Sequence, residues 1–303
     1  MFLKAYGKIN LALDVLGVRE DGYHEVKMVM QTVKLYDGIT IEKTNTGKIE
    51  LQSNLYYLPV DETNIVYKAV KLLFDEFNIT SGVKIVMDKA IPVAAGMAGG
   101  SADAATVLHG INQLFKLGLS KNELMKRGLK LGADVPYCIF RGTALCEGIG
   151  EKITRLPSMP ECYILIAKPK TNISTKSIYT ELDKKTITHH PDIDSMIEGL
   201  EEGNLSKVAD NLGNVLELVT VEECPVINDI KKVMMECNAL NTLMSGSGPT
   251  VFGLFSTEQQ AYEAKRRIQE EKLANPVYVT GLFDPVKNKK GDIYGRFKIK
   301  DRC

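Results

Sequence analysis

Apolar and polar residues alternate from the third residue of the chain. The odd positions from Leu3 to Leu13 are apolar or small, and polar residues occupy most of the even positions. These polar residues are Lys4, Tyr6, Lys8, Asn10 and Asp14. A period of two is typical of a β-strand, so the sequence predicts a strand with one polar face.

Helical and extended segments follow in turn. After Asp61 apolar residues recur at the spacing of one helix face. Ser120 and Glu123 have the spacing of a capping box, which marks the start of a helix. The expected elements are a helix that ends before Asn78, a strand at 83–87, a glycine-rich segment at 91–100, a second helix after it, and a third helix from Ser120 to Gly132.

A proline-rich stretch near Leu156 to Pro160 predicts a domain boundary. Interleaved patterns beyond it indicate an α+β arrangement, with strands at 162–167, 242–244, 251–255 and 277–280 and helices at 174–182, 193–200, 205–218 and 226–237. We therefore expect a first domain at 1–156, a second domain at 157–285, and a basic tail at 286–303 that forms a terminal strand or a mobile end.

The composition narrows the possible functions. The 303 residues exceed the size at which a single core keeps growing, which favours two domains with a cleft between them. The 38 basic and 38 acidic residues cancel, so we expect no nucleic-acid partner. No stretch has the length of a membrane span or the form of a secretory signal, which favours the cytoplasm. The six cysteines lack zinc-site spacing, and neither they nor the adjacent His189 and His190 predict a metal site.

The glycine-rich segment is the most informative part of the chain. Its small residues let backbone N–H groups approach phosphate oxygens, and the helix after it adds unpaired amides and a positive dipole end. It is neither a Walker A loop nor a GxGxxG fingerprint, and a tightly packed structural turn is the alternative. Ser101 is either a helix N-cap or a contact to phosphate and magnesium. The candidate nucleotide-binding residues are Pro92, Val93, Ala94, Ala95, Gly96, Met97, Ala98, Gly99, Gly100, Ser101 and Ala102.

Three separated motifs together resemble the GHMP kinases, a family that includes galactokinase, homoserine kinase and mevalonate kinase. They are Lys4 to Leu11 (KAYGKINL), the loop from Pro92 to Ala105, and Ser245 to Phe252 (SGSGPTVF). The resemblance implies a ribosomal-protein-S5-like first domain, a ferredoxin-like second domain, and ATP with Mg²⁺ between them. The stretches 17–24 and 131–136 are similar to members that phosphorylate a diphosphocytidyl sugar alcohol in non-mevalonate isoprenoid synthesis.

Asp134 and Lys8 match the catalytic residues of this family. The resemblance implies that Asp134 accepts or orients the proton of the attacking hydroxyl, and that Lys8 keeps Asp134 ionised and neutralises charge on the transferring phosphoryl group. Asp134 has an alternative role as a helix N-cap, because it lies two residues before Pro136. The alternative for Lys8 is a solvated surface lysine.

The substrate residues also follow from the resemblance. Asn10 shares a strand face with Lys8 and is expected to bind hydroxyls of the sugar alcohol. Tyr23, His24 and Tyr179 are expected to hold the cytosine, although helix packing is the alternative for Tyr179. Thr175 is a weaker candidate, and Asn64 is a weak candidate for the adenine pocket. Gly246, Ser247 and Gly248 are expected to complete the phosphate cradle from the second domain.

Four residues of the loop depart from the family pattern: Met97, Ala98, Ala102 and Asp103. Ala98 argues against a positive φ at its position. Asp103 brings a negative charge close to the phosphates, so we expect its carboxylate to face away from them or toward magnesium.

Two rival functions remain. One is a homoserine or mevalonate type of kinase, and the other is a non-catalytic nucleotide or sugar sensor on the same fold. The oligomeric state does not follow from the sequence.

Overall fold

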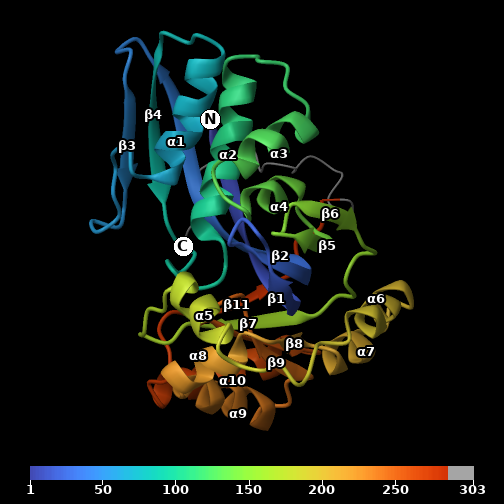
Figure 1. Ribbon diagram of the computed structural model, residues 1–303. Coiled ribbons are helices and arrows are strands. Elements are labelled where there is room, and N and C mark those ends of the chain that lie inside the picture. Colours follow the sequence, from blue (N-terminus) through green and yellow to red (C-terminus); the bar gives the residue numbers. More distant parts are fainter. Residues whose placement is uncertain (286–303) are drawn as a thin grey trace.

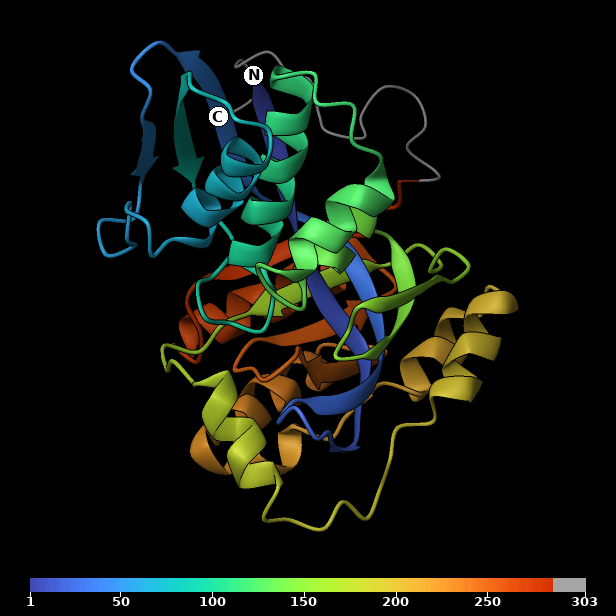
Figure 2. The same cartoon turned by 45° about the horizontal axis from the view of Figure 1, so that its top comes forward.

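Two β-sheets pack against each other in the centre of the molecule over part of their surfaces, and helices cover their outer sides (Figure 1). The computed structural model describes residues 1–285, and Figures 1 and 2 show the first half of the chain above the second. The mixture of helices and antiparallel strands confirms the predicted α+β class. The basic tail at 286–303 lies outside the described residues.

Among the described residues, seven strands form the first sheet. Its main path runs β3-β4-β2-β1-β8, while β5 pairs with the far end of β2 and also with β6. The strands are β1 (Phe2–Val18), β2 (His24–Thr44), β3 (Ile49–Ser53), β4 (Gly82–Asp88), β5 (Thr143–Gly148), β6 (Lys152–Arg155) and β8 (Gly213–Asn214). The short strand β8 comes from the second half of the chain and runs parallel to β1, so the two halves share one sheet.

The helices of the first half pack on the outer face of this sheet (Figure 1). They are α1 (Ile65–Glu76), α2 (Gly99–Leu114), α3 (Lys121–Leu129) and α4 (Val135–Phe140). The predicted capping box is confirmed, since Ser120 accepts from the Glu123 amide and the Glu123 side chain accepts from the Ser120 amide. Gly110 shows how closely α2 approaches the sheet, because a Cβ there would contact Leu3 and Ile41.

The second sheet is antiparallel throughout, in the order β11-β7-β10-β9. Its strands are β7 (Tyr163–Ala167), β9 (Asn241–Met244), β10 (Val251–Phe255) and β11 (Val277–Gly281). The helices of this half are α5 (Thr175–Leu182), α6 (Ile193–Glu201), α7 (Leu205–Asp210), α8 (Glu217–Glu223), α9 (Val226–Glu236) and α10 (Glu258–Glu270). Helices α9 and α10 cover the outer face of this sheet, where their buried residues join Val251 and Phe255 in one core.

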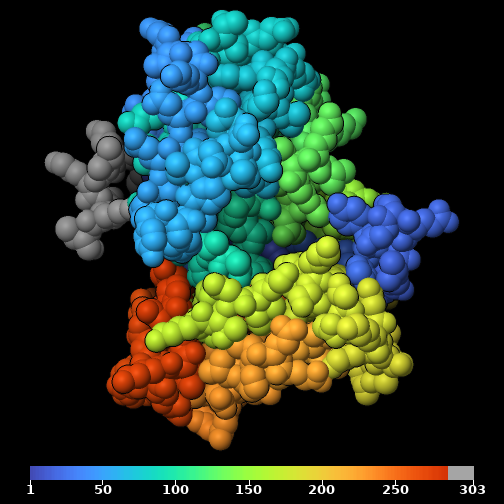
Figure 3. All heavy atoms as spheres, turned by 60° about the vertical axis from the view of Figure 1, so that its left-hand side comes forward, coloured from blue at the N-terminus to red at the C-terminus, as the bar shows by residue number. Residues whose placement is uncertain are grey.

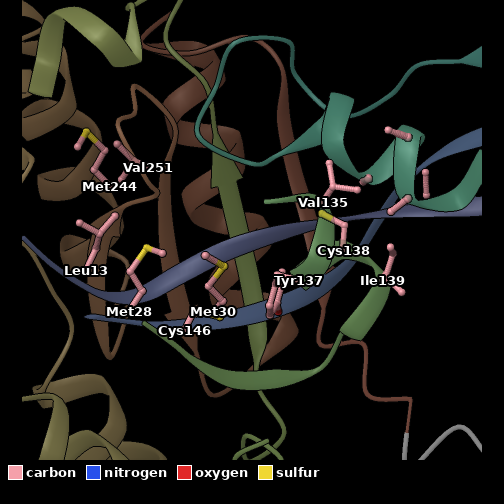
Figure 4. Close-up of a cluster of buried hydrophobic side chains, with 14 of the residues drawn as sticks. Leu13, Met28, Met30, Val135, Tyr137, Cys138, Ile139, Cys146, Met244 and Val251 are labelled. Atoms are coloured by element: carbon pink, nitrogen blue, oxygen red, sulfur yellow. The ribbon is translucent and has the colours of Figure 1, made fainter. Parts of the chain in front are cut away.

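A second core lies between the two sheets. Ile9 and Val29 of the first sheet pack here with Ile166 and Phe252 of the second. The larger core also crosses between the halves, because Leu13 and Met28 lie beside Met244 and Val251 (Figure 4). Burial of so much shared apolar surface fixes the two halves against each other.

Strand β1 departs from the uniform alternation that the sequence predicts. Its pairing with β2 shifts between Tyr6 and Lys8, which is the mark of a β-bulge. Leu3 packs on the helix side, whereas Ile9 packs between the sheets. The odd residues therefore change faces along the strand, and the single polar face that we predicted is wrong.

The predicted helix at 205–218 is also wrong. The chain forms α7, then the short strand β8, then α8. Gly213 packs against Pro191, and the side chain of Asn214 donates to the carbonyls of Met244 and Gly246 at 2.9 and 2.8 Å. These tertiary contacts outweigh the helical pattern.

The apolar pattern of the sequence does not predict two of the long elements, β2 and α10. Strand β2 is buried on both faces over much of its length, so its apolar residues do not alternate. Helix α10 buries only Ala261, Ala264 and Ile268, which is a narrow stripe of mostly small residues. The domain boundary near residue 156 stays a prediction.

The end of the described chain returns to the first sheet. The Phe283 amide donates to the Thr32 carbonyl at 2.9 Å, and the Phe283 ring stacks on Tyr6 with centroids 4.1 Å apart. Phe283 is almost fully buried. This contact adds a further connection between the two halves.

Replacing Phe283 with alanine is expected to destabilise the whole protein. The loss of a buried aromatic ring costs about 3–5 kcal/mol, and the two halves should still unfold in a single transition because they share cores. Urea unfolding followed by circular dichroism measures both effects. Tyr262→Ala is the control, since Tyr262 is half exposed on α10 and should change the free energy of unfolding little. A separate transition for each half would contradict the shared core.

Candidate active site

A cleft of about 1170 Å³ lies between the two halves of the chain. Its walls come from β1, β2, the loop before α2, the start of α4, helix α5 and the turn after β9. Figure 3 shows the hollow between the upper, blue-to-green part of the molecule and the yellow-green segment below it. The volume exceeds the roughly 300–1000 Å³ of a pocket for one small ligand, so the cleft has room for two.

The glycine-rich loop forms one end of this cleft. The residues from Pro92 to Ser101, apart from Met97, line it. Met97 and Ala102 are buried in the protein and do not line it. Helix α2 begins directly after the loop, so its first amides point toward the cleft wall.

Three residues of the loop have a left-handed backbone. Their φ angles are +50° at Ala94, +72° at Gly96 and +55° at Ala98. The expectation that Ala98 avoids a positive φ is therefore wrong. Ala98 occupies the position before α2, and its carbonyl accepts from the Ala102 amide at 2.8 Å. A single residue can take this conformation at a cost of roughly 1–2 kcal/mol, which the start of the helix offsets.

Ser245 joins the loop to the other two motifs. Its hydroxyl donates to the Gly96 carbonyl at 3.0 Å and accepts from the Asn10 amide at 3.3 Å. A Cβ on Gly96 would overlap the carbonyl oxygen of Ser245. Close approach of the two main chains therefore requires glycine at this position.

The turn after β9 closes the same end of the cleft. Gly246 and Ser247 line it, whereas Gly248 packs against Met244 and does not. Asn214 holds the Gly246 carbonyl, and the hydroxyls of Ser247 and Thr175 are 2.7 Å apart. Asn214 thus positions the turn from a segment where the sequence predicted only a helix.

Lys8 lies beside both loops. Its main-chain amide donates to the Met97 carbonyl at 3.1 Å, and a Cβ on Gly246 would lie 3.4 Å from its Nζ. The side chain is buried, so the alternative of a solvated surface lysine is wrong. Nζ donates to Oδ1 of Asn10 at 2.6 Å, and within the described residues no ion pair connects Lys8 to Asp134. In this state Asn10, rather than Asp134, holds the ammonium group.

Asp134 occupies the N-cap position of α4, but its side chain makes no capping hydrogen bond. The carboxylate lines the cleft instead. Burial raises the pKa of Tyr179, and the charge of Asp134 raises it further. Burial likewise raises the pKa of the Cys138 thiol, where Asp134 acts in the same direction and Lys8 in the opposite one. Asp134 and Lys8 both line the cleft.

Aromatic side chains form the other end of the cleft. The His24 ring on β2 lies 4.6 Å from the Tyr179 ring on α5, with the planes tilted by 43°. Tyr23, which is 58% exposed, lines the cleft next to them. Nε2 of His24 lies 2.7 Å from Oδ1 of Asp183, the residue that ends α5. The His24–Asp183 contact therefore bridges the two halves.

A buried charge cluster lies under the glycine-rich loop. The Lys89 ammonium donates to the carboxylates of Asp37 and Asp103, and Asp37 also accepts from the amides of Ala90 and Ile91. Burial raises the pKa of Asp103 to about 8, Lys89 lowers it in part, and Asp37 raises it. Oδ1 of Asp103 is buried without a hydrogen-bond partner. Asp103 and Lys89 also line the cleft, so the expectation that Asp103 faces away from the phosphates or toward magnesium stays a prediction.

Two further candidates have defined places. Ser101 lies in the first turn of α2 and lines the cleft, but Ala98 occupies the N-cap position, so the capping role of Ser101 is wrong. Asn64 is the N-cap of α1 and also lines the cleft.

Residues 1–285 contain no cluster of three His, Cys, Asp or Glu side chains that would bind a metal. Within the same residues, no helix has the length and apolar character needed to cross a bilayer.

Two of the three motifs lie in regions that match models of known families. Residues 64–142 match the model of the GHMP kinases N terminal domain, and residues 196–274 match the model of the GHMP kinases C terminal region. The chain belongs to the GHMP kinases. The predicted two-domain GHMP kinase fold is therefore confirmed.

Curated relatives of this kinase cover nearly the whole chain. A 4-diphosphocytidyl-2-C-methyl-D-erythritol kinase from Lachnospira eligens is 53% identical over 93% of this chain and 98% of its own length. The enzyme of the same name from Clostridium perfringens is 49% identical over 92% of this chain and 97% of its own length.

Solved structures agree with these relatives. A crystal structure of 4-(cytidine 5'-diphospho)-2C-methyl-D-erythritol kinase matches with a TM-score of 0.79 and 27% identity over 94% of this chain and all of that one. A homoserine kinase from Cytophaga hutchinsonii matches with a TM-score of 0.73 and 21% identity over 93% of this chain and 95% of that one. The second match shows a shared fold alone.

Sequence reasoning missed several residues around the cleft of this kinase. Asp37, Lys89, Asp183 and Asn214 fall outside the three motifs. Their importance comes from contacts between segments far apart in the chain, up to 159 residues for His24 and Asp183. Of the buried charge cluster, only Asp103 could be singled out from the sequence, because it departs from the family pattern of the loop.

Gly96→Ala is expected to impair nucleotide binding by the kinase. The added Cβ would force the glycine-rich loop away from Ser245, so we expect the Kd for ATP to rise at least tenfold, the equivalent of about 1.4 kcal/mol. Calorimetric titration with an ATP analogue measures the change. Gly118→Ala is the matched control, because Gly118 has nearly the same φ of +73° but no atom within 4 Å of its Cβ position. Equal losses in both variants would mean that backbone strain alone, rather than the Ser245 contact, explains the effect.

Asp103→Asn is expected to flatten the pH dependence of stability. The raised pKa makes the folded protein hold more protons than the unfolded chain between about pH 4 and about pH 8, so stability falls as the pH rises through this window. The wild type should lose roughly 2–4 kcal/mol from this group between about pH 5 and about pH 8. Urea unfolding across the range should show a smaller loss in the variant. The exposed control Asp75→Asn should keep the wild-type slope.

Proposed function

We propose that this kinase uses ATP to phosphorylate the 2-hydroxyl of 4-diphosphocytidyl-2-C-methyl-D-erythritol, a step of non-mevalonate isoprenoid synthesis. The observation that supports the proposal most strongly is a single cleft with two unlike ends. One end presents backbone amides and a helix start, which suit a triphosphate. The other presents the aromatic rings of Tyr23, His24 and Tyr179, which suit a flat base.

The two reacting groups would meet near Lys8 and Asp134. Phosphoryl transfer requires positioning, charge stabilisation and removal of one hydroxyl proton. The Asp134 carboxylate is the group that accepts or orients that proton, because the helix does not use it. The Lys8 ammonium stabilises the negative charge on the transferring group. Asn10 holds the ammonium and is expected to bind hydroxyls of the acceptor.

The glycine-rich loop and the Gly246–Ser247 turn would hold the triphosphate from opposite sides. Magnesium, which normally accompanies ATP, neutralises charge between the phosphates when bound. The Ser101 hydroxyl is the side chain of this loop that would contact it. Thr175 would reach the acceptor through its position beside Ser247.

The alternatives make different demands on the cleft. A homoserine or mevalonate type of kinase has a small acceptor and needs no aromatic pocket for a base. A sensor that does not catalyse needs neither Lys8 nor Asp134, and both side chains line this cleft. The proposed partners are therefore small molecules, and we expect the protein to work in the cytoplasm, where ATP and this pathway meet.

The test measures ADP release with four acceptors: 4-diphosphocytidyl-2-C-methyl-D-erythritol, homoserine, mevalonate and galactose. We expect turnover with the first alone. Asp134→Asn should lower kcat by about 10²–10⁴-fold, the range for loss of a general base, while the KM values change little. Asp210→Asn, at an exposed carboxylate that ends α7, is the control and should keep full activity.

Each contrary result has a distinct meaning. Turnover with another acceptor would keep the kinase and overturn the assignment of the aromatic end. Full activity of Asp134→Asn would remove the carboxylate from the chemistry. Absence of turnover with every acceptor, combined with tight binding of ATP, would favour the sensor.

A further inference from the structure

The contact between His24 and Asp183 has a chemical consequence for the aromatic end of the cleft. An ionised carboxylate has no proton to donate, so in the 2.7 Å contact Nε2 of His24 is the donor and Oδ1 of Asp183 the acceptor. In a neutral imidazole only one ring nitrogen carries a proton. Nδ1 of His24 is then left without a proton and can only accept.

The surroundings hold the ring in this arrangement. The His24 side chain is 13% exposed, and its ring lies against Tyr179, which packs on the larger core that both halves share. Asp183 is the C-cap residue directly after α5, where its amide donates to the Tyr179 carbonyl at 3.1 Å. No interaction that the described residues make occupies Nδ1 of His24. An acceptor nitrogen is therefore available beside the aromatic rings.

We propose that Asp183 is a specificity-determining positioning residue, which keeps His24 in the tautomer whose Nδ1 accepts and so selects a pyrimidine with an exocyclic amino group over one with a carbonyl. The inference rests on the proposed function, because it concerns the base of the proposed acceptor. Cytosine presents an amino group at its fourth carbon, and uracil presents an oxygen there. The amino group donates to Nδ1, whereas the oxygen would face another acceptor.

Asp183 acts through His24 and does not itself need to touch the base. Its loss should therefore relax discrimination rather than stop phosphoryl transfer. Asp183→Asn has nearly the same shape, but its amide can donate to Nε2 and so permits the opposite tautomer. In that tautomer Nδ1 carries the proton and can donate to the uracil oxygen.

The first experiment observes the tautomer without any substrate. Nitrogen-15 NMR of the imidazole rings distinguishes a protonated from an unprotonated nitrogen, and His24→Gln identifies the signal of His24 among the 4 histidines. We expect an Nε2-protonated ring in the wild type and a growing Nδ1-protonated population in Asp183→Asn. An Nδ1-protonated ring in the wild type would overturn the inference.

The second experiment compares cytidine 5'-diphosphate with uridine 5'-diphosphate by calorimetric titration, in the presence of a saturating ATP analogue. The wild type should bind the cytidine compound at least tenfold more tightly, the size expected for one unpaired polar group. Asp183→Asn should lose most of this ratio. With the full diphosphocytidyl and diphosphouridyl acceptors, the change should fall on KM while kcat stays within about twofold, because the reacting groups are untouched.

Asp194→Asn is the matched control. Asp194 pairs with Lys27 at 2.9 Å and also connects β2 to a helix of the second half, but neither residue lines the cleft. This variant should keep both the tautomer and the cytidine preference. If it relaxes the preference as much as Asp183→Asn does, a general loosening between the halves explains the effect and the inference fails.

The binding measurement separates this inference from the proposed function. A preference for cytidine diphosphate that depends on Asp183, without turnover of the proposed acceptor, would overturn the function and keep the role of Asp183. Turnover of the acceptor with no preference for cytosine over uracil would keep the function and overturn the role of Asp183.

Discussion

The hydroxyl of Ser245 makes the contact on which the rest of the site depends. It connects the Asn10 amide and the Gly96 carbonyl, which are 235 and 149 residues away in the chain. One hydroxyl, fully buried, thus fixes the strand that carries Lys8, the glycine-rich loop and the turn after β9. Because Gly96 lacks a side chain, the two main chains approach closely enough for this bond to form. The end of the cleft that we propose for the phosphates is therefore set mainly by backbone geometry.

The aromatic end of the cleft is built by a different principle. Its surface consists of side chains, and the two halves meet there through the His24–Asp183 pair and the His24 and Tyr179 rings. Side chains can be exchanged without disturbing the fold, whereas a change in the glycine-rich loop displaces a main chain. This difference gives a physical reason why one fold can serve kinases that are named for different acceptors, such as homoserine and mevalonate.

Much of this arrangement follows from the sequence, but only where local rules apply. The capping box at Ser120, the helix that ends before Asn78 and the strand–loop–helix order around the glycine-rich segment all depend on neighbouring residues. The bulge near Gly7 does not, because a period of two contains no sign of an inserted residue until the strand pairs with another. The contacts of Asn214 and Asp183 could not be predicted for a related reason, since their partners lie far away in the chain. The glycine-rich end of the cleft consists largely of motif residues, whereas at the aromatic end the His24–Asp183 contact involves a residue outside every motif.

The buried cluster beneath the loop resolves an apparent conflict in the sequence. Asp103 places a carboxylate close to where a triphosphate would bind, and two like charges at short range in a poorly solvated site repel strongly. The structure avoids this repulsion in two ways. Lys89 neutralises one of the two carboxylates in the cluster, and the raised pKa of Asp103 lets the other hold a proton near neutral pH. The cluster can then anchor the start of the loop through the hydrogen bonds that Asp37 accepts from two amides, without adding negative charge to the proposed phosphate site. Its carboxylates therefore serve to hold the loop in place, which is compatible with an anion site that depends on neutral backbone donors.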